Sequence, residues 1–209
     1  MDHLTEGRIT RFKNLISRRQ FDLTVVLENV HDRHNIGAVM RTCDAVGIPE
    51  IYVIFSEKHL QEEGIVAKTS SSGSKKWVKI NYFENLDECL SAVKKKYKNI
   101  WATHLGEESK DLYELNLTEP TALLFGNEHD GVSAEALTHC TGNFIIPQFG
   151  MVQSLNISVA CAVSLFEALR QRKNKGNYDS EFNEFNKQQK EMFDHFVQRQ
   201  LNNSRDDSH

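Results

Sequence analysis

The chain has 209 residues, 39% of them hydrophobic, and a formal net charge of −4 with a pI near 6.1. This length can bury one sizeable core, so we expect one main domain. The acidity argues against a protein that coats nucleic acid, because such binders carry a net basic field. No stretch approaches the roughly 18 apolar residues that span a bilayer, and four scattered cysteines indicate no disulfide framework. We therefore expect a soluble, cytoplasmic protein without a membrane partner.

Short apolar runs alternate with helical patterns along the chain. A β-branched run at 23–27 precedes a helical pattern at 35–46, which the stop signals Gly47 and Pro49 close before a second run at 51–55. The alternation continues with expected strands at 77–80, 100–103, 122–125 and 144–146, and with expected helices at 86–97, 133–139 and 154–172. This order predicts an α/β fold with a mostly parallel sheet flanked by helices.

The two ends of the chain differ from this central part. Residues 1–20 form a basic, helix-like segment, and the region after Gly176 carries four phenylalanines at helical spacing, typical of an amphipathic helix that docks on the domain or on a partner subunit. The expected organisation has three parts: an N-terminal basic extension (1–20), a central domain (21–172), and a C-terminal amphipathic helix with a tail (173–209).

Three segments with small or amide side chains each follow an apolar run and lead into a helix. They are Asn-Ile-Gly-Ala-Val-Met-Arg-Thr at 35–42, Gly-Asn-Glu-His-Asp-Gly-Val-Ser at 126–133, and Ile-Pro-Gln-Phe-Gly-Met-Val-Gln-Ser-Leu-Asn at 146–156. Because ligands bind at the carboxyl ends of parallel strands, the three segments predict one site assembled from three loops.

Each segment also has a plain structural interpretation. Arg41 points away from the core face of its helix, so it either pairs with Asp44 or binds a phosphate with its forked guanidinium. The loop around Glu128 is either a turn or a ligand contact, and Ser154 is either a helix N-cap or part of the site. His31 and His34 lack further ligands at suitable spacing, so we expect no metal.

Together the three segments resemble the three motifs of the SpoU, or TrmH-type, branch of the SPOUT RNA methyltransferases. The matches occur in the family's order and spacing and run from about residue 23 to residue 172. The flanking sequences at 19–28 and 41–47 look closest to the members that methylate the 2′-hydroxyl of guanosine 18 in the D-loop of tRNA. The resemblance implies an enzyme that uses S-adenosylmethionine (AdoMet), has a deep C-terminal trefoil knot, and assembles as a homodimer.

The resemblance also implies roles for individual residues. The residues that match the family's catalytic and site-shaping positions are Arg41, Asn35, Glu128, Ser154 and Asn156. The residues that match its cofactor pocket are Thr103, Gly126, Ile146, Ser154 and Leu155. The arginines expected to hold tRNA are Arg8, Arg11, Arg19, Arg170 and Arg172.

Two other functions compete with tRNA methylation. One is ribose 2′-O-methylation of ribosomal RNA by a member of the same family. The other is a non-catalytic protein, either an RNA chaperone or a regulator that senses AdoMet. A protein of the second kind would bind the cofactor without transferring a methyl group.

Overall fold

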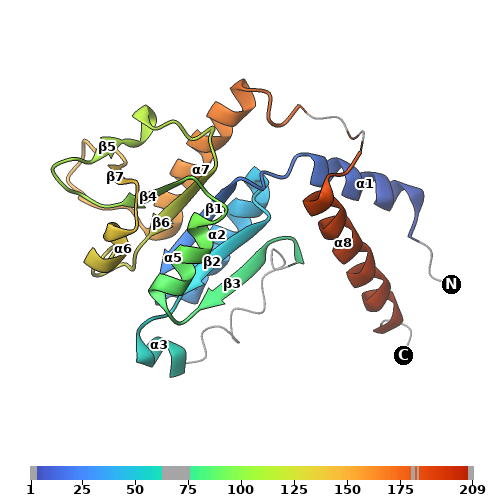
Figure 1. Ribbon diagram of the computed structural model, residues 1–209, viewed down its shortest axis with the longest axis horizontal. Coiled ribbons are helices and arrows are strands. Elements are labelled where there is room, and N and C mark those ends of the chain that lie inside the picture. The colour runs from blue at the N-terminus through green and yellow to red at the C-terminus, as the bar shows by residue number, and fades with distance from the viewer. Residues whose placement is uncertain (1–3, 63–75, 180–181, 183, 207–209) are drawn as a thin grey trace. The chain divides into compact units, whose positions relative to one another are not determined.

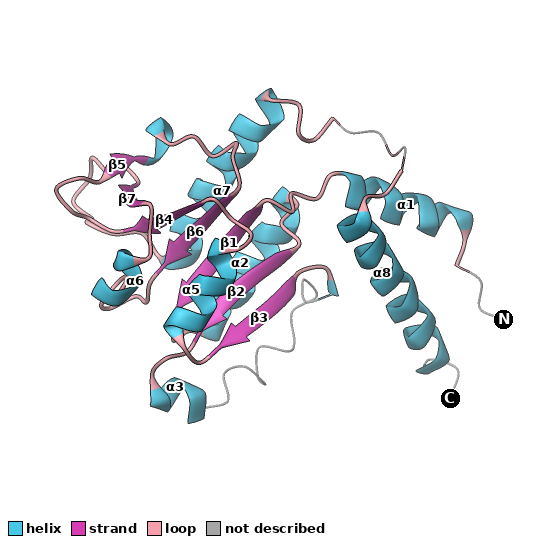
Figure 2. Cartoon of the chain, in the orientation of Figure 1, coloured by secondary structure: helices cyan, strands magenta, loops and turns pink. Residues whose placement is uncertain are grey.

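The central feature is one sheet of parallel strands (Figure 1 and Figure 2). The structure is a computed structural model that describes residues 4–62, 76–179, 182 and 184–206. Within these residues the sheet has seven strands in the order β3-β2-β1-β6-β4-β7-β5. They are β1 (Leu23–Glu28), β2 (Glu50–Ile54), β3 (Lys79–Phe83), β4 (Asn99–Thr103), β5 (Lys110–Asp111), β6 (Thr121–Phe125) and β7 (Gly142–Ile145). Every pairing is parallel, which confirms the predicted α/β class.

Helices cover both faces of this sheet. The helices after β1 are α2 (Arg33–Val46), α3 (Lys58–Glu62), α5 (Leu86–Lys94), the 3₁₀ turn η3 (Leu112–Glu114), α6 (Ala134–Thr138) and α7 (Ile157–Asn174). Helices α2 and α7 share one hydrophobic core with the sheet, and α5 and α6 share the other (Figure 1). The elements expected from the sequence did not include α3, η3 or β5, which have two to five residues each.

The two central strands, β1 and β6, explain why the sheet needs both layers. All their residues are buried, and successive side chains enter opposite cores: Leu27 joins the core of α2 and α7, whereas Val26 joins that of α5 and α6. In β6, Phe125 and Leu124 divide in the same way. Near-continuous apolar runs of this kind are typical of parallel strands with both faces covered.

Two predicted helix starts were wrong. Helix α7 begins at Ile157 rather than Ser154, because the Asn156 side chain accepts a hydrogen bond from the Ser158 N–H and serves as N-cap. The phenylalanine stripe is not one helix, since α8 (Lys187–Asp206) begins after Phe182 and Phe185. These two rings instead pack in the segment that precedes α8, 4.6 Å apart between centroids.

The chain divides into two compact units, residues 20–175 and residues 1–19 with 176–209. In the second unit, α1 (Glu6–Ser17) packs along α8 through the buried rings of Phe12 and Phe196, whose centroids lie 5.7 Å apart (Figure 1). Arg8 donates to the side-chain oxygen of Gln200 at 2.9 Å, which adds a polar contact between the two helices. The ends of the chain thus form one helical pair.

Membrane insertion finds no support in the helices that are described. None of them combines the length and apolar character that a bilayer crossing requires. The four cysteines are unpaired, and burial raises the pKa of the Cys89 thiol to about 12. Such a thiol stays protonated and unreactive at neutral pH.

A polar cluster around Glu50, at the amino end of β2, makes stability depend on pH. Burial opposes ionisation of this carboxylate, but hydrogen bonds from Lys96 (2.7 Å) and Asn81 (2.9 Å) and the nearby lysine charges outweigh it, so the pKa is lowered. A lowered pKa in the folded state adds stability above the unfolded-state value of 4.5 and loses it as the pH falls through the folded-state value.

We therefore expect Glu50→Gln to destabilise the protein at pH 7 and to do so less and less below about pH 4.5. Urea unfolding of both proteins between pH 7 and pH 3 measures the difference. The exposed Glu107 provides a matched control, since Glu107→Gln removes a carboxylate for which no contact is seen in the described part of the chain. A constant difference for Glu50→Gln across this range would contradict the role assigned to its charge.

Candidate functional site

Three amide and carboxylate side chains from distant parts of the chain meet at the carboxyl edge of the sheet. The Asn35 Nδ2 atom donates to Glu128 Oε1 at 2.6 Å, and Asn156 Nδ2 donates to Asn35 Oδ1 at 3.2 Å. The three residues come from the three segments that the sequence singles out. The structure therefore joins the segments through one continuous chain of hydrogen bonds.

Local structure fixes each member of this chain. Asn35 is buried in the first turn of α2, where Asp32 is the N-cap. Asn156 uses its oxygen to cap α7, which leaves its amide N–H groups to face Asn35. Glu128 lies in a tight loop in which the Asn127 side chain accepts from the N–H groups of His129 and Asp130. Because the acceptors and donors are complementary, Asn35 is held in one orientation.

The close approach of two glycines shapes the Glu128 loop. A Cβ atom on Gly126 would lie 1.9 Å from the carbonyl carbon and oxygen of Gly131, so no side chain fits there. Gly131 itself has a φ of +71°, and its N–H donates to the Asn127 carbonyl at 3.2 Å. The loop consequently turns back on the end of β6.

Gly126→Ala is expected to lower the free energy of unfolding by about 1–3 kcal/mol, because the backbone of the loop must shift to admit the methyl group. Thermal unfolding measures the loss. Gly37→Ala is the matched control, since nothing lies within 4 Å of its added Cβ, and alanine favours the helix. Equal stability of Gly126→Ala and the wild type would show that the loop is not tightly constrained.

A second link, which the sequence did not reveal, braces the same loop. The buried carboxylate of Glu28, at the end of β1, accepts hydrogen bonds from the Ser133 hydroxyl and from the Ser133 N–H (3.1 Å). The Ser133 hydroxyl also caps α6. The sequence does indicate that the Glu28 carboxylate, at the end of a mostly apolar strand, needs buried hydrogen-bond donors.

Arg41 lies on the exposed side of α2, six residues after Asn35 in the sequence. In the residues that the structure describes, no hydrogen bond or ion pair holds its guanidinium, and the expected pair with Asp44 is not among the contacts seen there. The exposed guanidinium of Arg41 is thus available for an outside anion.

The residues that match the cofactor pocket follow three neighbouring strands, β6, β4 and β7. Thr103 ends β4 and donates its hydroxyl to the Leu124 carbonyl at 3.3 Å, and Gly126 follows β6. Ile146 follows β7 and is half-buried, as is Leu155, whereas Ser154 is exposed. This half of the edge offers apolar surface at Ile146 and Leu155, which suits a purine ring.

The predicted RNA-binding arginines differ in their exposure. Arg11 is exposed on α1, and Arg8 is half-buried against α8. Arg19 is only 5% exposed, which does not match the surface position expected for a phosphate contact. Arg170 is exposed and forms a two-bond ion pair with Glu167.

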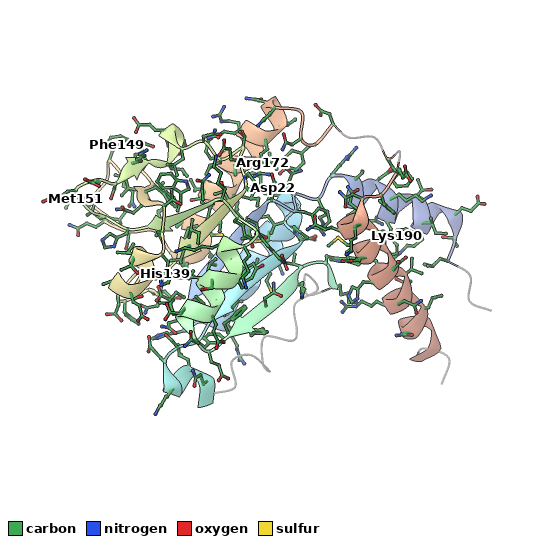
Figure 3. The ribbon with its side chains drawn as sticks, in the orientation of Figure 1. Asp22, His139, Phe149, Met151, Arg172 and Lys190 are labelled. Carbon is green, nitrogen blue, oxygen red and sulfur yellow. The ribbon has the colours of Figure 1, made fainter. Side chains whose placement is uncertain are left out.

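The prediction for Arg172 was wrong. Its side chain is 0% exposed and donates to the carbonyls of Leu117, Glu119 and Asp22 and to the side chains of Asp22 and Gln20 (Figure 3). All five N–H groups face protein acceptors, so none remains for RNA. Arg172 instead connects the end of α7 to the start of β1.

No metal-binding group of three or more histidine, cysteine or carboxylate side chains is present among the described residues.

Known proteins resemble this chain in sequence and in fold. Residues 22–166 match the SpoU rRNA Methylase family. The tRNA (guanosine(18)-2′-O)-methyltransferase of Thermus thermophilus is 46% identical over 179 residues, which are 86% of this chain and 90% of that protein. The crystal structure of the A. aeolicus TrmH/SpoU tRNA modifying enzyme superimposes with a TM-score of 0.79 at 36% identity and covers 94% of this chain and 98% of its own.

A third similarity concerns a protein with its cofactor bound. The SpoU methyltransferase AviRb from Streptomyces viridochromogenes, solved in complex with AdoMet, matches with a TM-score of 0.61 at 26% identity over 74% of this chain and 59% of its own. The order of the motifs, the parallel sheet and these matches agree. The chain belongs to the SpoU rRNA methylase family.

Proposed function

We propose that this protein transfers a methyl group from AdoMet to the ribose 2′-hydroxyl of guanosine 18 in the D-loop of tRNA. The observation that carries the proposal is the hydrogen-bonded chain from Glu128 through Asn35 to Asn156, which unites the three motifs at one point. The similarity to the T. thermophilus enzyme extends over 90% of that protein and favours tRNA over ribosomal RNA as substrate.

The residues at the ends of β6, β4 and β7 fit AdoMet. The half-buried Ile146 and Leu155 offer apolar contact for the adenine ring. Thr103 and Ser154 add hydroxyl groups at the same edge. When bound, AdoMet supplies a methyl group on a sulfonium. AviRb, a structural neighbour with AdoMet bound, supports this cofactor.

The protein's own residues then have two tasks, positioning and charge stabilisation. The rigid Asn35 amide and the Glu128 carboxylate orient the ribose for an in-line approach, and positioning of this kind can contribute roughly 7–11 kcal/mol. Arg41 binds the RNA phosphate, orients the hydroxyl and stabilises the developing alkoxide. An arginine stays protonated in proteins, so it acts here as a donor and not as the base, and the 2′-hydroxyl proton passes to solvent water late, as the new C–O bond forms.

In this proposal the helical pair of α1 and α8 serves as the tRNA-holding module, and residues 21–172 form the methyltransferase domain. We expect Arg11→Ala to weaken binding of every tRNA alike, by a few-fold, and to flatten the dependence of affinity on salt, because a phosphate contact releases a counterion. Filter binding of two tRNA species at several salt concentrations measures both effects. A loss confined to one tRNA would contradict a phosphate contact.

We propose that the protein assembles as a homodimer in the cytoplasm and that the C-terminal part of each chain is knotted. Exposed apolar side chains support the dimer: Phe149 and Met151 project from the loop after β7 (Figure 3) and are 99% exposed, and Val159 and Phe166 are exposed on α7. Apolar patches of this kind mark interaction surfaces. Family membership supports the deep trefoil knot, which ordinary topology rules would disfavour.

Mass spectrometry of nucleosides from tRNA methylated in vitro tests the function, with mapping of the modified ribose. We expect 2′-O-methylguanosine at position 18. Transfer to 23S ribosomal RNA fragments but not to tRNA would favour the ribosomal alternative. AdoMet binding in calorimetry without transfer to any RNA would favour a regulator.

A further inference from the structure

The carboxyl edge of the sheet has two halves that meet at β6. On one side lie the ends of β4 and β7, which carry the residues proposed for AdoMet. On the other side lie the ends of β1 and β2. The polar side chains in the loops between these two strands and the helices that follow them have no part in the mechanism described above. A substrate nucleotide with its ribose at Asn35 must place its base somewhere along this edge.

Three side chains form a row across the second half. They are His129, His31 and Glu57, which follow the neighbouring strands β6, β1 and β2. The ring centroids of His31 and His129 lie 5.8 Å apart with 54° between their planes, and His31 Nε2 lies 4.0 Å from Glu57 Oε2. The row begins next to Glu128, the residue that holds Asn35. It therefore extends outward from the proposed reaction centre.

The chemistry of this row matches a guanine base. His129 is exposed, and the side chains of His31 and Glu57 are 34% and 37% exposed, so all three present surface to a ligand. Proteins that recognise unpaired RNA bases stack them on aromatic rings, histidine included, and bond their edges. The Watson–Crick edge of guanine carries two adjacent donors, N1–H and the 2-amino group. A carboxylate offers two acceptors to receive them.

We propose that the row of His129, His31 and Glu57 binds the base of the target guanosine, an inference that rests on the proposed function. The exposed imidazole of His129 supplies the stacking surface, the tilted His31 ring lies between it and Glu57, and Glu57 accepts hydrogen bonds from N1–H and the 2-amino group. The edge of the sheet is then shared in order: AdoMet at β4 and β7, the ribose at Asn35 and Glu128, and the base at β1 and β2.

Variants of His129 test the stacking surface. His129→Ala is expected to lower kcat/KM for tRNA by on the order of tenfold, mainly through KM, because a base loses its stacking partner. His129→Phe keeps a ring and should restore kcat/KM to within about threefold of wild type. The Kd for AdoMet, measured by calorimetry, should not change in either variant. Wild-type kinetics in His129→Ala, or an equal loss of AdoMet affinity, would overturn the proposal.

An inosine at the target position tests Glu57, because inosine lacks only the 2-amino group of guanosine. The wild type should prefer guanosine about five- to tenfold in kcat/KM. Glu57→Ala should methylate both substrates equally, whereas Glu88→Ala, which removes an exposed carboxylate on α5, should keep the preference. A preference that survives in Glu57→Ala overturns the assignment of Glu57.

The experiments distinguish a failure of the proposed function from a failure of the base site alone. If the wild-type protein methylates no ribose in tRNA, the proposed function and the base site fall together. If the wild type methylates guanosine 18 while the His129 and Glu57 variants behave like it, the function stands and the base site alone is rejected.

Discussion

Arg41→Lys is expected to lower kcat for methyl transfer by on the order of 100-fold or more, the effect seen when one preorganised donor to a developing oxyanion is removed. Lysine keeps the charge, but it cannot present two parallel donors to a phosphate and an alkoxide at once. Arg41 is exposed on α2. Thermal stability and the Kd for AdoMet should therefore stay at their wild-type values. Single-turnover transfer of a tritiated methyl group to tRNA measures the rate.

Arg33→Lys is the matched control for this experiment. Arg33 is an exposed arginine in the first turn of the same helix, and the proposed mechanism does not use it. Arg33→Lys should lower the rate of methyl transfer by less than Arg41→Lys does. Near-normal turnover in Arg41→Lys would show that a simple positive charge suffices there, and that the guanidinium has no special part in the reaction.

Arg172→Met is expected to reduce the free energy of unfolding by about 3–5 kcal/mol, because a fully buried guanidinium and all of its hydrogen bonds are lost. The change removes five donors at once and leaves the carbonyls of Leu117 and Glu119 without them. In a chain of 209 residues, such a loss corresponds to a fall in Tm of about 6–20 °C. Thermal unfolding followed by circular dichroism gives the value directly.

Arg170→Met separates this structural role from a general effect of losing an arginine. Arg170 lies on the same helix, and its 60% exposed side chain pairs with Glu167, whose side chain is only 6% exposed but also accepts a hydrogen bond from Gln171. Because Arg170 reaches water and Glu167 keeps its hydrogen bond from Gln171, the control should lose less stability than Arg172→Met. If the two variants melted together, the buried network around Arg172 would not be the source of its stability.

Features with a local cause were predictable from the sequence. Gly47 ends α2 with a φ of +89°, and its N–H bonds back to the helix, as a glycine stop signal requires. Ser133 caps α6 for an equally local reason. The apolar runs predicted the strands, because helices cover both faces of the sheet and successive strand residues are therefore apolar.

Features that depend on distant partners were not predictable. Arg172 sits in the last turn of α7, where basic residues commonly lie at the surface, and its burial depends on acceptors near residues 20–22 and 117–119. The predicted start of α7 was too early because Leu155, which precedes the N-cap Asn156, continues the apolar pattern of the helix. The link from Glu28 to Ser133 joins residues 105 positions apart, a distance that no periodicity spans.

The pairing of α1 with α8 has a consequence for synthesis. Residues 6–17 leave the ribosome well before residues 187–206 exist, and at about 5–20 residues per second the interval lasts roughly ten to thirty seconds. Throughout that time the Phe12 ring lacks the Phe196 ring against which it packs in the finished protein. The nascent chain therefore exposes the apolar face of α1 during most of its translation. Chaperones that bind this face early would dissociate once α8 has emerged and covers it.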